Sequence, residues 1–527
     1  AVGDVKYVWE LNRLQFLPAM AALARSRGHT KAYDYCLACI ESWIDANPPF
    51  KGINWVSGIE LAIRSVNLML TVSLIGAEQI PPTIARKIRT ALNTHAIWLA
   101  RFPSRFSSAN NHLIAEAGAL FILGTAMPDL PGAARYRAYG HATLVREAGK
   151  QILDDGVGAE QSPTYTGFTL EWYLLALSVA RADGKTFPAS VTERLHGAGI
   201  HLRWITDGAG NQPRIGDDDE GRVICCGPER QRHYVSGILS GLAVATGDPA
   251  LAPPALHPHL RDAFLGAAPD HSAGPEGRRV FDTGGYTVFR RQLAGRQAML
   301  VFDHGPLGYL PIAAHGHADA LSVWLHLDGQ PVLIDAGTYL YHSGGAMRDY
   351  FRGTRAHNTL TLDDQDQSRI SAAFIWSRKA KCWRLPEPDA GGDRCVAGQH
   401  DGYLKRFGLL HQRRVCFGEP DAITIIDKLI GVPKSPDLTA QIRYHIAPYI
   451  DVTHREANQL DLAIDGALIA TITLNMGSGG APCPVRLVTS KISQHFGVIS
   501  DGQCILSELS ASDLLTAELN VRLCFKN

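Results

Sequence analysis

The spacing of the hydrophobic residues changes once along this chain. Between residues 8 and 245, apolar side chains recur every three or four positions, as do Leu11, Leu14 and Leu17. Farther on, they alternate with polar side chains, as in residues 468–474. A period near 3.6 predicts amphipathic helices, whereas a period of two predicts strands that bury one face. The chain is therefore predicted to place a helical part before a strand-rich part.

Roughly nine or ten helices with short connections are predicted for the first part. Beyond two N-terminal segments, the predicted helices cover residues 58–76, 83–101, 110–125, 132–153, 169–183, 190–205 and 229–246. Such helices pack as antiparallel pairs, which form either an open solenoid or a closed toroid. In the second part, short strands separated by turn residues predict an antiparallel β-sandwich.

A stretch rich in Pro, Ala and Gly, between residues 252 and 275, separates the two parts. A chain of 527 residues is also too long for one ordinary hydrophobic core. We therefore predict a helical domain at residues 1–270 and a β-sandwich domain at residues 275–527. Because binding clefts favour domain interfaces, we expect the functional site between them.

The composition excludes some classes of partner. Lys and Arg number 51 and balance 51 Asp and Glu, so nothing marks a nucleic-acid or membrane-surface binder, and a polyanion would be bound by a local patch. No run approaches the roughly 18 apolar residues of a membrane span, so we expect none. No signal peptide is found, and because the first residue is Ala1 we expect a processed periplasmic or secreted protein, with a cytoplasmic protein as the alternative.

The ten cysteines show no disulfide framework. Cys36 and Cys39 lie in an apolar helical pattern, Cys225 and Cys226 are adjacent, and the other six are scattered through the second half. We expect buried free thiols, with a redox pair at Cys36 and Cys39 as the alternative.

The stretch from 313 to 358 is unusually dense in imidazole, carboxylate, phenol and guanidinium groups. Apolar runs on either side of an Asp-Gly turn at 328–329 predict a β-hairpin. If the preceding segment is extended, His315, His317 and Asp319 lie on one face, which suits either a metal site or a proton-transfer site.

A possible zinc ligand set lies in the same stretch. His317, Asp335 and His357 supply two imidazoles and one carboxylate, a combination that zinc accepts. A straight hairpin would place Asp335 opposite residue 322, so the loop that carries His317 has to fold back. The alternative is that these histidines only form hydrogen bonds with loop backbone.

In the helical part, Asn110, Asn111 and His112 stand at the start of a predicted helix. The helix N-terminus carries partial positive charge, which favours a substrate anion. Glu116 lies four residues after His112 and is expected to orient its ring. Plain N-capping by Asn110 or by the preceding serines is the alternative.

Two further segments carry reactive side chains. Tyr165, in a predicted non-helical link, is expected to donate or accept a proton, and a tyrosine packed at a helix start is the alternative. The acidic run at 217–219 is expected to be a solvated loop, with calcium or substrate contact as the alternative.

Five motifs carry a family resemblance. They are residues 110–112, 160–165, 315–319, 335–339 and 352–359. In this order they resemble the heparinase II/III group of polysaccharide lyases, and the N-terminal motifs (residues 4–13 and 52–55) resemble its heparinase III branch. The resemblance implies an incomplete (α/α) toroid followed by an antiparallel β-sandwich. It also implies β-elimination at a uronic acid, with the active site in the cleft.

The chemistry of that reaction explains the residue types. The C5 proton, next to the carboxylate of the uronic acid, is too weakly acidic to be removed while the carboxylate keeps its full charge. By the resemblance, Asn111 neutralises the carboxylate with His112 beside it. Tyr165 is the acid, and also the base if proton and leaving group lie on the same side of the ring. His315 is the base for the opposite epimer.

The resemblance also implies a metal and a substrate. Zinc that buttresses the cleft would be held by His317, Asp335 and His357. Secondary substrate contacts are expected from Asn54, Trp55, Glu60, Arg64, Glu160, Tyr341 and Arg348, although packing would explain Trp55 equally well. A heparan-sulfate-type glycosaminoglycan is the first expectation. Alginate or a bacterial exopolysaccharide is the alternative, because His112 follows Asn111 as in alginate-lyase-like relatives.

Two other classes of function remain open. A glycoside hydrolase also fits a helical toroid, and it would take its two carboxylates from Glu60, Glu116, Glu160 or the acidic run at 217–219. A non-catalytic polysaccharide-binding protein is the other alternative.

Overall fold

The computed structural model describes residues 3–225, 233–254, 259–266, 273–309, 311–386, 392–418, 421–477 and 480–526. The chain divides into two compact units. The helical unit contains Ala1–Ile152, Thr164–Gly199 and Glu220–Ser272, and the strand-rich unit contains Leu153–Pro163, Ile200–Asp219 and Ala273–Asn527. Two segments of the predicted helical domain, 153–163 and 200–219, thus belong to the strand-rich unit.

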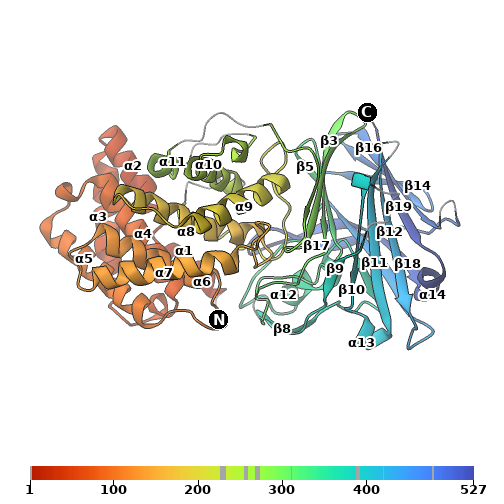
Figure 1. Ribbon diagram of the computed structural model, residues 1–527, viewed down its shortest axis with the longest axis horizontal. Helices are drawn as coiled ribbons and strands as arrows, with labels where there is room; N and C mark the ends of the chain where they lie inside the picture. The colour runs from red at the N-terminus through yellow and green to blue at the C-terminus, as the bar shows by residue number, and fades with distance from the viewer. Residues whose placement is uncertain are drawn as a thin grey trace. The chain divides into compact units, whose positions relative to one another are not determined.

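Five of the seven helices with predicted bounds, α4–α7 and α9, begin and end within two residues of the predicted positions. Figure 1 shows the helices of the first part. They are α1 (Val5–Asn12), α2 (Leu17–Arg27), α3 (Thr30–Ala46), α4 (Gly58–Ile75), α5 (Pro82–Arg101), α6 (Asn111–Ala126), α7 (Ala133–Gln151), α8 (Pro163–Ala182), α9 (Ala189–Ile205), α10 (Tyr234–Thr246) and α11 (Asp262–Leu265). The predicted helix at 229–246 starts outside the described residues. The predicted start of α8 was wrong by six residues, because Pro163 suits the first helical turn and begins the helix there.

Helix α4 is long and apolar enough to cross a membrane by length and composition alone. Within the helical unit, however, 67% of it is buried. Its buried residues include Glu60, Arg64 and Asn67, which have partners inside the unit. Its apolar character is therefore explained by its place in a protein core.

Helices α6 and α7 approach so closely that their backbones touch at two glycines. A Cβ atom on Gly124 would lie 2.4 Å from the carbonyl oxygen of Ala133, and one on Gly140 would lie 2.5 Å from that of Ala117. Only glycine fits such positions without movement of a helix. The pair forms the framework that holds the start of α6.

Two large sheets and one small sheet make up the strand-rich unit (Figure 1). The first sheet contains β1 (Gly277–Phe281), β2 (Tyr286–Leu293), β3 (Arg296–Asp303), β4 (Val323–Leu327), β5 (Gln330–Leu333), β13 (Thr439–Ile446), β18 (Val498–Ser510) and β17 (Arg486–His495) in this order, with β6 (Leu360–Leu362) paired to β13. The second contains β14 (Asp451–Glu456), β15 (Gln459–Ile464), β16 (Ala467–Met476), β19 (Leu519–Phe525), β12 (Ala422–Gly431), β11 (Leu409–Gly418), β10 (Cys395–His400) and β9 (Cys382–Arg384). The small sheet pairs β7 (Arg369–Ala372) with β8 (Ile375–Arg378), and short helices α12 (Gly345–Arg352), α13 (Leu404–Phe407) and α14 (Ala511–Thr516) connect strands.

The two large sheets form an antiparallel sandwich. Their paired strands run antiparallel throughout the described ladders. Alternate residues of β11 are buried, and side chains of both sheets share one hydrophobic core, where Phe289 stacks on Phe417 at 5.6 Å between ring centroids. The predicted hairpin is confirmed. Asp328 and Gly329, both with positive φ, join β4 to β5 as the Asp-Gly turn requires.

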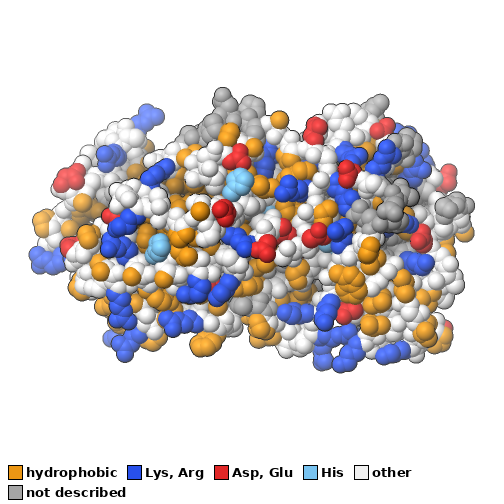
Figure 2. All heavy atoms as spheres, in the orientation of Figure 1, with side chains coloured by type: hydrophobic (Ala, Val, Ile, Leu, Met, Phe, Trp, Pro, Cys, Tyr) orange, Lys and Arg blue, Asp and Glu red, His pale blue; other side chains and the backbone are white. Residues whose placement is uncertain are grey.

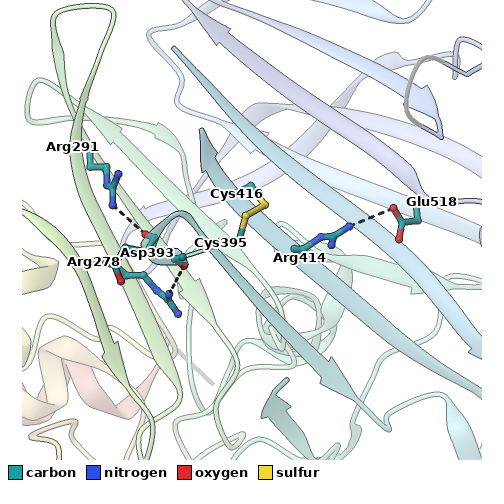
Figure 3. Close-up of a disulfide and its surroundings, with 8 residues drawn as sticks. Arg278, Arg291, Asp393, Cys395, Arg414, Cys416 and Glu518 are labelled. Carbon is teal, nitrogen blue, oxygen red and sulfur yellow. Dashed lines mark hydrogen bonds and ion pairs between the residues drawn. A yellow bond between two sulfur atoms is a disulfide. The ribbon is translucent and has the colours of Figure 1, made fainter. Parts of the chain in front are cut away.

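One disulfide contradicts the expectation for the cysteines. Cys395 of β10 lies opposite Cys416 of β11 in the antiparallel ladder, and the two are bonded (Figure 3). Seven other cysteines in the described part of the chain are free thiols, and Cys226 lies outside it. The expectation of free thiols was wrong for this pair, because strand pairing brings together cysteines that are 21 positions apart in the sequence.

The α6–α7 contact gives a stability prediction with a control on the same helix. Gly140→Ala should destabilise the helical unit by about 2 kcal/mol, because the new methyl group meets backbone of α6. Gly149→Ala should stabilise it by up to about 1 kcal/mol, because nothing lies within 4 Å of that position. Denaturant unfolding followed by circular dichroism at 222 nm measures both. Equal effects of the two substitutions would contradict the predicted backbone contact.

Candidate active site

Helix α6 begins at the Asn-Asn-His motif. Asn110 is the N-cap, and its side-chain oxygen accepts a hydrogen bond from the backbone N–H of His112 at 3.3 Å. Asn111, the first helical residue, is fully buried, whereas His112 is half-buried. The cap explains Asn110 alone, and Asn111 and His112 remain predicted site residues at the positive end of a helix.

Glu116 does not orient His112, contrary to the sequence-based expectation. Its carboxylate accepts hydrogen bonds from the backbone N–H and the hydroxyl group of Ser104, both at 2.7 Å. A Cβ atom on Gly58 would lie 2.2 Å from this carboxylate, so α4 encloses it from another side. Burial outweighs the two hydrogen bonds and raises the pKa of Glu116 to about 7. Glu116 thus fixes the segment that leads into α6.

Tyr165 lies in the first turn of α8 and is mostly buried, with 8% of its surface exposed. The predicted non-helical link therefore ends at Ser162, three residues before it. The phenol belongs to the helical unit, together with Asn111 and His112.

Four residues predicted to contact substrate are buried in the helical unit. Asn54 donates hydrogen bonds to the side chains of Asn12 and Asn47. Trp55 packs against His95, with ring centroids 5.0 Å apart.

Two of the four form part of a charged network. Both side-chain oxygens of Glu60 accept from Arg13 at 2.8 Å. Arg64 lies 4.2 Å above the ring of Trp43, and burial lowers its pKa to about 9. These contacts match a structural role for Asn54, Trp55, Glu60 and Arg64, which is the alternative weighed for Trp55.

In the strand-rich unit, two glycines let the loops of the site approach one another. A Cβ atom on Gly316, between His315 and His317, would lie 1.6 Å from the carbonyl oxygen of Leu307. Gly216 has φ 61°, and a Cβ atom there would lie 2.7 Å from the carbonyl oxygen of His315. The loop of residues 213–219 therefore runs directly beside the histidine loop.

Asp217 is the centre of this arrangement. Its carboxylate lies 3.0 Å from Nδ1 of His315 and 3.0 Å from Nε2 of His317. Arg348 donates to both of its oxygens. Asp217 is fully buried, so the acidic run is not a solvated loop at this position. Burial alone would raise the pKa of Asp217, but the charge of Arg348 and the two imidazoles hold it well below its ordinary value.

His315 keeps one ring nitrogen away from Asp217. That atom, Nε2, lies 3.7 Å from the carboxylate of Glu160. The ring of Tyr341 lies 6.2 Å from the imidazole, and Arg348 lies 4.9 Å above the same tyrosine. Burial lowers the pKa of His315, but the bond to Asp217 and the charge of Glu160 outweigh it and leave that pKa raised.

His317, Asp335 and His357 form a buried group whose ligand atoms lie within 4.8 Å of one another. Nδ1 of His317 and Nε2 of His357 have no hydrogen-bond partner among the described residues. The other nitrogen of each ring is bonded, to Asp217 and to Asp335 at 2.8 Å. Two unpartnered imidazole nitrogens beside a carboxylate are a donor set that zinc accepts. The residues therefore fit a metal, and the loop that carries His317 does fold back as predicted.

Two family models match this chain. Residues 2–219 match the family described as Heparinase II/III N-terminus, and residues 273–507 match that described as Heparinase II/III-like, C-terminal. The chain belongs to the heparinase II/III family. The predicted fold class, an incomplete (α/α) toroid followed by an antiparallel β-sandwich, is confirmed for this family member. A crystal structure of heparinase III has a TM-score of 0.77 and 19% identity, over 100% of this chain and 78% of that one.

Two curated relatives match most of this heparinase II/III chain but are themselves longer. A heparin-sulfate lyase of Pedobacter heparinus is 24% identical over 82% of this chain and 61% of its own length. A heparin-sulfate lyase of Bacteroides thetaiotaomicron is 23% identical over 81% of this chain and 59% of its own length. The chain thus spans about three fifths of these relatives.

The predicted site residues of the family member fall into two groups. Asn111, His112 and Tyr165 belong to the helical unit, and the strand-rich unit brings together Glu160, His315 and the residues around them. Convergence of the two groups on one sugar ring stays a prediction. Sequence reasoning did not predict the contacts of Asp217 with the two histidines. Gly216, directly before the acidic run at 217–219, was a usable signal, because a glycine there permits close approach of another loop.

The raised pKa of Glu116 predicts a pH effect on stability. A carboxyl group whose pKa rises from 4.5 to about 7 on folding stabilises the protein fully below pH 4.5, and this contribution is lost as pH rises to 7. The loss is on the order of 3 kcal/mol. Between pH 5 and pH 8, the melting temperature of Glu116→Gln should therefore fall by several degrees less than that of the wild type. Circular dichroism at 222 nm measures both melting temperatures. Glu193→Gln, an exposed glutamate of α9, is the control, and identical pH profiles of all three proteins would contradict the prediction.

Proposed function

We propose that this protein is a polysaccharide lyase that cleaves a heparan-sulfate-type glycosaminoglycan by β-elimination at a uronic acid. The observation that carries the proposal is the imidazole of His315, held by a buried carboxylate within a chain that matches both parts of the heparinase II/III family. Heparin-sulfate lyases are the curated relatives, which supports this substrate class over alginate or an exopolysaccharide.

The proposed reaction divides among residues of this chain. The amide of Asn111, at the positive end of α6, hydrogen-bonds the substrate carboxylate and makes the C5 proton more acidic. Because Nδ1 of His315 faces Asp217, Nε2 is the atom that accepts the C5 proton, and Glu160 favours the resulting imidazolium. Tyr165 donates a proton to the departing O4.

The surface is compatible with an acidic polymer. Figure 2 shows Lys and Arg side chains interspersed with Asp and Glu on the face that it presents, with Lys and Arg the more prominent along the lower edge. With a net charge of +0, the protein as a whole does not attract a polyanion strongly. We therefore assign recognition of the uronate to the site residues.

The test is the formation of a 4,5-unsaturated uronate, which absorbs in the near ultraviolet. Heparan sulfate should give this absorbance, and alginate should give little. A protein that produces reducing ends without the absorbance is a glycoside hydrolase, and one that binds heparan sulfate without cleavage is a binding protein. Either outcome would refute the proposal.

Single substitutions test the assigned roles. Asn111→Ala, Tyr165→Phe and His315→Ala should each lower kcat at least about 100-fold while the protein stays folded, because each removes a proton-transfer or charge-stabilising group. Tyr173→Phe is a control on the same helix, since that hydroxyl group donates to the Leu144 carbonyl inside the unit. Full turnover by Tyr165→Phe would exclude the phenol as the acid.

We further propose that His317, Asp335 and His357 hold a zinc ion that stabilises the strand-rich unit and does not take part in the elimination. The two unpartnered imidazole nitrogens support this assignment. Bound zinc would supply charge and rigidity next to the loop that carries His315.

Elemental analysis tests the metal. Protein purified without chelators should contain about one zinc ion per chain, and His317→Ala or Asp335→Ala should lose it, melt at a lower temperature and turn over more slowly. The exposed His454→Ala should keep the metal. Wild-type protein without zinc would refute this assignment.

We also propose a periplasmic or secreted location. The disulfide between Cys395 and Cys416 supports it, because such bonds persist mainly in oxidising compartments.

A further inference from the structure

We propose that Asp217 positions both the base His315 and the metal ligand His317, so that turnover and zinc affinity depend on the same carboxylate. This inference rests on the proposed function and names a residue to which the family resemblance gave no role. It makes the metal site and the base parts of one hydrogen-bonded unit.

The two imidazoles need opposite tautomers, and Asp217 selects both. At His315 the carboxylate faces Nδ1, which must carry the ring proton in order to donate it. The lone pair of the neutral ring is therefore on Nε2, which can accept a proton. At His317 the carboxylate faces Nε2, which must carry the proton, so Nδ1 presents its lone pair to the metal group. One carboxylate that accepts from both rings therefore fixes two protonation patterns at once.

Arg348 keeps this carboxylate ionised inside the protein. It donates to both oxygens of Asp217 and to the carbonyl oxygen of Ala373. A buried carboxylate without a cationic partner would take up a proton. A protonated carboxyl group could not accept hydrogen bonds from both histidines. Arg348 was expected to contact substrate, and its contacts in the structure are with Asp217 and the residues around it.

The backbone also holds Asp217 against His315. The N–H of Asp217 donates to the carbonyl oxygen of His315 at 2.9 Å, and the hydroxyl group of Ser162 donates to the carbonyl oxygen of Asp217 at 2.7 Å. A shift of either loop would therefore move the carboxylate and the imidazole together. This double attachment suits a positioning role, because the ring angle is set by both main chain and side chain.

The experiment compares Asp217→Asn with Asp207→Asn. An asparagine keeps the shape of the side chain but offers one acceptor atom and an N–H group, so it cannot accept from both rings. Asp207 is a buried aspartate that lies 2.7 Å from His326, outside the site. It is therefore a matched control for the loss of stability that follows when a buried, histidine-bound aspartate becomes asparagine. The measurements are the zinc Kd by chelator competition, kcat and KM on heparan sulfate, and the melting temperature.

Asp217→Asn should raise the zinc Kd by about 10–100-fold and lower kcat by about 10–100-fold, with KM within about threefold of wild type. Asp207→Asn should change only the melting temperature. If Asp217→Asn leaves Arg348 unpaired and fails to fold, Asp217→Asn combined with Arg348→Gln removes both charges and is measured in the same way.

The proposal is overturned if Asp217→Asn matches Asp207→Asn in zinc Kd and kcat, or if only one of the two quantities changes. A wild type that binds no zinc overturns it as well. A wild type that forms no unsaturated product refutes the proposed function instead, and the zinc Kd of Asp217→Asn still decides whether this carboxylate orients the metal ligand.

Discussion

The part of the candidate site that lies in the strand-rich unit depends on one set of contacts, those of Asp217 with Arg348, His315 and His317. Burying an ionised carboxylate lowers the stability of a protein unless a cation balances its charge and donors occupy its oxygen atoms. Here Arg348 supplies the charge, and His315 and His317 supply the remaining donors. Because the group is satisfied only when all partners are present, the loops that carry them are held in one arrangement.

A second buried polar network, in the β-sandwich, holds the same loops. Arg413, paired with Asp427, donates hydrogen bonds to the carbonyl oxygens of Leu321 at 2.8 Å and Asn358 at 2.5 Å. The side chain of Asn358 in turn donates to carbonyl oxygens of residues 323 and 334. These contacts hold the ends of the segments that carry His317 and His357. The site is thus attached to strands of both large sheets, which is the support that a metal or proton-transfer site requires.

How much of this could be predicted differs between the fold and the site. Periodicity located the helices within a few residues, and the Asp-Gly turn located the β4–β5 hairpin, because both signals are local. Asp217 and the Cys395–Cys416 disulfide depend on contacts between distant segments, which local patterns do not contain. Arg64 and Trp55 were assigned to substrate because their side chains suit it, but only the packing of the helical unit shows that they are buried. Chemistry of a side chain predicts what it can do, whereas its surroundings decide whether it is accessible.

In the proposed mechanism, charge balance explains how the carboxylate of Asp217 can orient His315 as a base for an anionic uronate. An unpaired aspartate next to His315 would repel a uronate and weaken its binding, because both carry negative charge. The guanidinium of Arg348 cancels the charge of Asp217, so the aspartate orients the ring without adding net charge. Glu160 is a second carboxylate near this ring, at 3.7 Å from Nε2 of His315. Its attraction is strongest once the imidazole has taken a proton, so in the proposed reaction it favours the state after proton transfer over the state before it. The proposed mechanism therefore separates orientation of the base, assigned to Asp217, from stabilisation of the imidazolium, assigned to Glu160.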